Sequence, residues 1–138
     1  MNVFYFAGLG LLLIIVAFLG WKYKPIRINK KYFYQEWKVL QKLLADKSTW
    51  IKSVIDADEL FDEALKKRHF KGKSMGERMV SAQRFIKDND GLWFAHKLSN
   101  KLDSNPKTRL NKKDTLSALT GFKKALQDLG ALPDDKRK

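Results

Sequence analysis

The residues best suited to chemistry lie in the stretch WFAHKLSNKLDSN, residues 93–105. His96 is the side chain there that exchanges a proton near neutral pH, and Asn100 follows four residues later, on the same face of a helix. Together with a fixed cation, such a pair would act on a phosphate group. The cations nearby in the sequence are Lys97, Lys101 and Arg109. The simpler interpretation, which we favour, is that His96 is a partly buried helix residue bonded to a neighbour.

Other kinds of reactive site lack the residues that they need. The chain has no cysteine, and its two histidines, His69 and His96, fall on different predicted helices, so zinc sites and cysteine nucleophiles have no support. The segment GKSMGER, residues 72–78, ends like a phosphate-binding loop, but the upstream glycine and the preceding strand are missing. Ser74 and Glu77 instead have the spacing of a capping box at a helix start. We therefore expect no metal and no cofactor.

The chain is strongly basic, with 28 Lys and Arg against 15 Asp and Glu and a net charge of +13. Only Lys22, Lys24 and Arg27 precede residue 28, so most of the excess belongs to the remainder of the chain. Such a field attracts polyanions, either nucleic acid or anionic lipid headgroups. The alternative is a solvated basic face without a specific partner. The residues expected to form a polyanion-binding surface are Lys66, Lys67, Arg68, Lys71, Lys73, Arg78, Arg84, Lys97, Lys101, Lys112 and Lys113.

The N-terminal segment is predicted to span a membrane. Residues 3–21, VFYFAGLGLLLIIVAFLGW, contain no charge, and as a helix they would measure about 28 Å, close to the thickness of a bilayer core. A cleavable signal peptide would begin with a basic region and end at a small-residue cleavage site, and neither is present. A buried core helix would usually be shorter and would show a polar face. We therefore assign residues 1–22 as a transmembrane helix.

Basic residues follow the span and none precedes it, which predicts that the N-terminus lies outside and the remaining chain lies in the cytoplasm, at the plasma membrane. The absence of cysteine agrees with a reducing compartment. Residues 23–30 form a basic juxtamembrane linker in this interpretation. The residues expected to contact lipid headgroups there are Lys22, Lys24, Arg27, Lys30 and Lys31.

The remaining residues, 31–133, are predicted to be helical because apolar positions recur every three or four residues. Helices are expected over residues 31–45, 51–71, 74–87, 92–102 and 112–129. Ser48 and Asn111 are predicted N-caps, Phe85 and Ile86 are both expected to face inward, and Gly130 ends the last helix. The fold class is therefore all-α: an N-terminal transmembrane helix followed by an antiparallel four- to five-helix bundle. Residues 134–138 are predicted to be a disordered tail.

The order of these features resembles a known family. A bundle helix carrying Trp93, His96 and Asn100, then a loop and a last amphipathic helix that ends LQDLGAL, resembles the HEPN-like (higher eukaryote and prokaryote nucleotide-binding) helical domains. The likeness is greatest to small, membrane-anchored versions from reduced-genome bacterial lineages. It covers roughly residues 51–132, including the segment 57–82.

Many members of that family are ribonucleases, whose signature is an Arg-Asn pair with a His a few residues on, completed across a dimer. In this sequence Asn100 matches the Asn, whereas Ser99 stands at the Arg position and Ser104 at or near the His position. Serine supplies neither a proton carrier near neutral pH nor a cation for the phosphate. The resemblance therefore implies a catalytically inactive domain, and His96 with Arg109 would be needed for any residual ribonuclease.

Three functions remain open at this point. The one we favour is a membrane-anchored module for interaction with a protein partner or a second copy, with the charge holding it against anionic lipid. The second is binding of RNA or DNA through the basic face, by phosphate neutralisation without base reading. The third is a residual ribonuclease that depends on His96. No small-molecule substrate is evident in the sequence.

Overall fold

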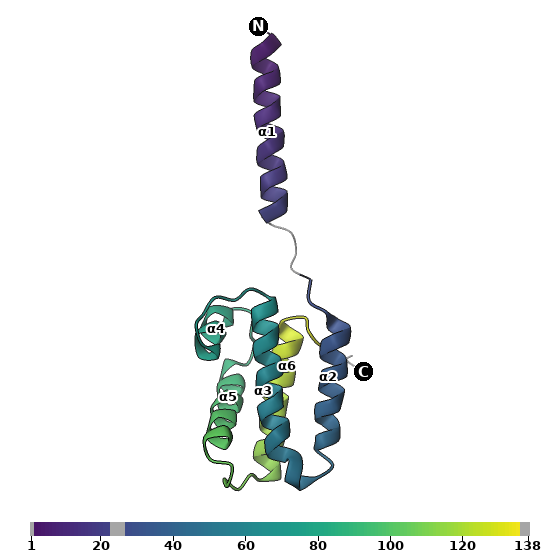
Figure 1. Ribbon diagram of the computed structural model, residues 1–138, viewed down its shortest axis with the longest axis vertical. Coiled ribbons are helices and arrows are strands. Elements are labelled where there is room, and N and C mark those ends of the chain that lie inside the picture. Colours follow the sequence, from purple (N-terminus) through teal and green to yellow (C-terminus); the bar gives the residue numbers. More distant parts are fainter. Residues whose placement is uncertain (1, 23–26, 136–138) are drawn as a thin grey trace.

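The computed structural model describes residues 2–22 and 27–135, and these ranges contain six α-helices, one short 3₁₀ turn and no strand (Figure 1). The predicted all-α class is confirmed. The elements are α1 (Asn2–Lys22), α2 (Lys30–Leu43), η1 (Lys47–Thr49), α3 (Trp50–Lys67), α4 (Met75–Ala82), α5 (Asn89–Ser104) and α6 (Lys112–Asp128).

Helix α1 is the apolar N-terminal segment. Its 21 residues give a helix about 32 Å long, and the part from Asn2 to Trp21 is long and apolar enough to cross a membrane. None of it is buried against the remainder of the molecule. Of the predicted linker, residues 23–26 lie outside the described residues.

Helix α2 begins with an N-cap, since the Asn29 side chain accepts a hydrogen bond from the Tyr32 backbone N–H at 3.1 Å.

Helices α2, α3, α5 and α6 form an up-and-down bundle in which each follows the previous one in the opposite direction (Figure 1). Helix α3 is central, since it contacts α2, α4, α5 and α6. Its fully buried Phe61 lies against Phe122 of α6 with 6.3 Å between the ring centroids. The apolar residues at three- and four-residue spacing therefore meet in one core, as their periodicity predicts.

Helices α5 and α6 approach each other closely at two glycines. A Cβ atom added to Gly121 of α6 would lie 2.7 Å from the carbonyl oxygen of Gly91 in α5. Gly91 itself follows Asp88, whose side chain caps α5 by accepting a hydrogen bond from the Gly91 N–H at 2.9 Å. The absence of a side chain at Gly121 thus fixes how near α6 can come to the start of α5.

The bundle has two distinct ends. At the proximal end α2 begins and α3 and α6 finish; at the distal end α2 and α5 finish and α3 and α6 begin (Figure 1). Two contacts hold the proximal end together. The Tyr32 hydroxyl donates to the Glu63 carboxylate at 2.8 Å, joining α2 to α3. The Arg68 guanidinium donates from Nε to the Leu129 carbonyl at 2.7 Å, joining the end of α3 to the end of α6.

The region after α4 differs from the prediction. Helix α4 stops at Ala82, and a turn closed by the Phe85 N–H and the Ala82 carbonyl leads directly to α5. This turn returns Ile86 to the core but leaves Phe85 60% exposed. The prediction that this helix continues to residue 87 was therefore wrong, and so was the prediction that Phe85 faces inward. Helix α5 begins at Asn89, three residues earlier than expected, because Asp88 supplies its N-cap.

The start of α3 also differs from the prediction. Ser48 was expected to be its N-cap, but Thr49 holds that position and makes no capping bond with its side chain. The Ser48 N–H instead donates to Asp46, which caps η1 at 2.9 Å. Asn111 and Gly130 behave as expected: Asn111 caps α6, and Gly130 follows that helix with a φ of 75°. Of the predicted tail, Asp135 accepts from Lys123 at 3.1 Å, and residues 136–138 lie outside the described residues.

Candidate functional site

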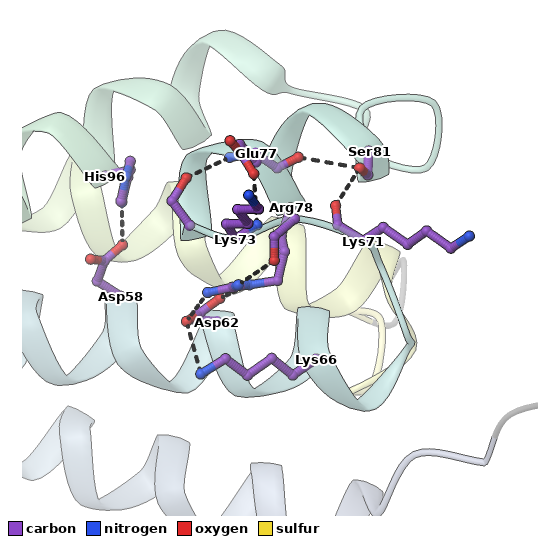
Figure 2. A network of polar contacts seen from close by, with 11 residues as sticks. Asp58, Asp62, Lys66, Lys71, Lys73, Glu77, Arg78, Ser81 and His96 are labelled. Atoms are coloured by element: carbon purple, nitrogen blue, oxygen red, sulfur yellow. Dashed lines mark hydrogen bonds and ion pairs between the residues drawn. The ribbon is translucent and has the colours of Figure 1, made fainter.

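The candidate site is a polar network between α3 and α5. His96 of α5 and Asp58 of α3 lie 2.9 Å apart, from the imidazole Nδ1 to the carboxylate Oδ1 (Figure 2). On the other side of the ring, Nδ2 of Asn100 is 3.4 Å from Nε2 of His96, as the four-residue spacing predicts. The edge of the His96 ring also meets Trp93, with 6.0 Å between the centroids.

The His96 side chain is fixed by its neighbours in the protein. His96 is 9% exposed, and both of its ring nitrogens face a partner from the protein. The contacts to Asp58 and to Asn100 therefore set the orientation of the imidazole ring from both sides. This arrangement confirms the interpretation of His96 as a partly buried helix residue bonded to its neighbours. The sequence did not indicate that Asp58 bonds to His96, because Asp58 is one of several acidic residues in its segment.

The two serines of the degenerate motif do not share a surface. Ser99 is 2% exposed and faces the bundle interior, whereas Ser104 is the exposed last residue of α5. Arg109, the predicted substitute cation, lies exposed in the segment between α5 and α6. Among the described residues, Asn100 is therefore the only residue of the motif with a hydrogen bond to His96.

Arg78, a predicted polyanion-binding residue, is committed to an internal ion pair. Its guanidinium donates to both carboxylate oxygens of Asp62, at 2.7 and 2.8 Å, and to the Gly72 carbonyl at 3.0 Å (Figure 2). The hydrogen bond that Arg78 donates to Asp62 raises the pKa of Arg78, and the residue is 9% exposed. Arg78 is therefore not part of an exposed basic surface, because α4 packs against the part of α3 that carries Asp62. The arginine therefore joins α4 to α3.

Two further candidates have internal partners. Arg68 donates from Nε and Nη2 to the Leu129 carbonyl at the end of α6, where a cation also complements the helix dipole. Lys66 lies 3.5 Å from the Asp62 carboxylate, although its side chain is 62% exposed. Arg68 thus has a structural contact at the proximal end, while Lys66 keeps most of its surface in solvent.

The segment GKSMGER is a helix start, as predicted. The Ser74 hydroxyl accepts from the Glu77 N–H at 3.2 Å, and the Glu77 carboxylate reaches back to the Lys73 N–H at 2.6 Å (Figure 2). The return bond falls one residue before the cap, but both backbone donors are satisfied. Ser81 then donates to the Lys71 carbonyl at 2.6 Å, which ties the preceding loop to α4.

The remaining predicted cations do not form one face. Those at the proximal end are Lys67, Lys71, Lys73 and Arg84, and those at the distal end are Lys101, Lys112 and Lys113; all are exposed. Lys97 lies on the exposed side of α5 between them. Helix α3, with its 18 residues, separates the two ends by about 27 Å. The sequence therefore located the charges correctly but could not show that the fold divides them.

The predicted headgroup contacts fall partly within the described chain. Arg27, Lys30 and Lys31 are exposed at the proximal end, next to the start of α2. Lys24 and the side chain of Lys22 lie outside the described residues. Within residues 2–22 and 27–135, no three His, Cys, Asp or Glu side chains are grouped so that they could hold a metal ion.

A hollow of about 550 Å³ lies between the start of α5 and α6. Its lining includes Gly91, Phe94, Leu116 and Gly121, and it does not include His96. The polar network and this hollow are therefore separate features. A ligand in the hollow would meet Phe94 and Leu116 together with the polar side chains Asp88, Lys113, Asp114, Ser117 and Thr120, and it would not meet the imidazole.

No family model, no curated protein and no solved structure matches this chain. The HEPN-like resemblance and the functions that it implies therefore stay predictions.

Proposed function

We propose that this chain is a single-span membrane protein whose helical bundle faces the cytoplasm at the plasma membrane and acts as a non-catalytic binding module of HEPN-like type. Its partner is a protein or a second copy of the chain. The anchor would be α1, which is long and apolar enough to span and is not buried by the remaining molecule. The basic residues that follow α1 support the cytoplasmic orientation.

The observation that carries the non-catalytic part is the contact between His96 and Asp58. The imidazole has a partner on both nitrogens and little exposed surface. A ribonuclease would need this group to reach a phosphodiester with a cation beside it. Arg78 of α4, a buried cation, is instead paired with Asp62 of α3. His96 therefore joins α3 to α5 in this proposal.

Topology is tested by fusing a compartment-sensitive reporter after Lys138. The proposal requires that a reporter active only in the cytoplasm gives signal and that one active only outside gives none. A mature chain that starts after residue 22 would show that α1 is removed as a signal sequence. Signal from the outside reporter would overturn the orientation.

The distal end supports a second candidate function, nucleic-acid binding. Its exposed cations include Lys101, Lys112 and Lys113, and the adjoining loop adds Lys107 and Arg109. Phosphate contacts of this kind release counterions, so binding would weaken steeply with salt. A gel shift of structured RNA by the full chain in nanodiscs, measured at two salt concentrations, tests it. A salt-sensitive shift that K112E/K113E removes would favour this function over a protein partner.

A further inference from the structure

The proximal end carries an exposed aromatic side chain among cations, and this combination suits a lipid surface. Phe85 is 60% exposed and packs on one side against Phe70, with 5.5 Å between the ring centroids. Phe70 lies three residues after the last residue of α3, and its N–H donates to the Leu65 carbonyl of that helix at 3.1 Å. We call the group formed by Phe70, Lys71, Arg84 and Phe85 the proximal patch.

Each ring of the proximal patch has an exposed cation next to it in the sequence. Arg84 precedes Phe85 in the chain, and Lys71 follows Phe70. Both are exposed. The Lys71 carbonyl is held by Ser81 of α4 at 2.6 Å, which keeps this lysine beside α4. Exposed Lys67 and Lys73 add charge at the same end.

Four carboxylates at the proximal end have partners elsewhere in the bundle. Asp62 is paired with Arg78, Glu63 accepts from Tyr32, and Glu77 caps α4. The Asp128 carboxylate accepts from the Lys87 backbone N–H at 2.9 Å. Among the described residues, none of these acids forms an ion pair with Lys71 or Arg84. The cationic side chains of the patch therefore point to solvent with their charge available.

The tether keeps this end near the bilayer. Helix α1 ends at Lys22 and α2 begins at Lys30, so residues 23–29 connect them. Fully extended, such a segment reaches at most about 25 Å. If α1 spans the membrane as proposed, the start of α2 stays within that distance of the surface. The tether alone does not set the direction of the bundle, whose distal end lies about 27 Å further along α3.

We infer that the proximal patch docks on the anionic lipid headgroups of the membrane that α1 crosses, with Phe85 inserted at headgroup level. Aromatic rings favour this depth, and each Lys or Arg near an anionic surface raises the bound population about fivefold. Docking would fix the orientation of the bundle and direct the distal end toward the cytoplasm. This inference rests on the proposed membrane anchor.

The test uses the full chain in nanodiscs, because the absence of cysteine allows a fluorophore to be attached at single introduced cysteines. The positions are Leu13→Cys in α1, Phe85→Cys in the patch, where an apolar fluorophore replaces the ring, and Lys107→Cys at the distal end. Quenching by spin-labelled lipid is compared between zwitterionic discs and discs with about one third phosphatidylglycerol. We expect quenching at 13 in both lipids, at 85 in anionic discs only, and at 107 in neither.

Charge reversal supplies the matched control. K71E/R84E and K112E/K113E change the net charge equally, but only the first alters the patch. We expect K71E/R84E to reduce quenching at 85 to the level at 107, and K112E/K113E to leave it unchanged. Quenching at 13 without quenching at 85 would overturn the docking and leave the anchor intact. No quenching at 13 would overturn the proposed anchor itself.

Discussion

Removing either partner of the pair formed by Asp58 and His96 should destabilise the bundle, and removing both should cost less than the sum. The two side chains are 12% and 11% exposed and meet at 2.9 Å. Loss of one partner leaves a buried polar group unsatisfied, which costs about 1–3 kcal/mol. His96→Ala also loses packing against Trp93. We expect Asp58→Ala and His96→Ala each to lie in this range, with a coupling free energy of about 1–2 kcal/mol.

The assay is urea unfolding of the full chain, followed by circular dichroism, for the wild type, both single variants and the double variant. A matched control is Asp56→Ala combined with His96→Ala. Asp56 lies on the same helix but bonds to Lys52 at 2.7 Å, so its effect should add to that of His96 within about 0.5 kcal/mol. If the effects of Asp58→Ala and His96→Ala also add within that margin, the two side chains do not act as a structural pair. A stabilising His96→Ala would indicate a strained, functional histidine instead.

Three further predictions test the fold that positions this network. His69 follows α3 with a φ of 59°, so His69→Gly should raise the free energy of unfolding by about 1 kcal/mol. Gly130 holds the equivalent position after α6, so Gly130→Ala should lower the free energy of unfolding by a similar amount. Thermal unfolding measures both changes. Gly121→Ala should cost about 1–3 kcal/mol in the same measurement, because the added Cβ meets a backbone carbonyl of α5 at 2.7 Å. The hydrogen bond to Glu63 raises the pKa of Tyr32 to about 12, so this contact stabilises the fold below pH 10.0 and is lost as the pH rises toward 12. An absorbance titration, with Tyr32→Phe as the blank, should show a lower pKa of Tyr32 in Glu63→Ala.

Local features of the fold could be predicted from the sequence, because helix periodicity and caps depend on residues a few positions apart. The Ser74 cap, the Asn111 cap and the stop at Gly130 are of this kind. The turn at residues 83–85 was missed because Phe85 continues the apolar spacing of α4. Its exposure follows from the path of the chain to α5, which is set by packing against α6.

The site depended on contacts between distant residues. Asp58 and His96 are 38 positions apart, and Asp62 and Arg78 are 16 apart. A single sequence shows that acids and bases are present but not which of them meet. For the same reason the sequence could not separate the proximal cations from the distal ones, since that division follows from the direction of each helix in the bundle.

The most direct test of the proposed function is a single-turnover RNA assay with the full chain in nanodiscs. End-labelled structured RNA is incubated with excess protein, and the wild type is compared with His96→Ala. A non-catalytic module in which His96 only joins α3 to α5 predicts intact RNA with both proteins. Cleavage by the wild type that His96→Ala abolishes would contradict it and would make His96 a catalytic residue.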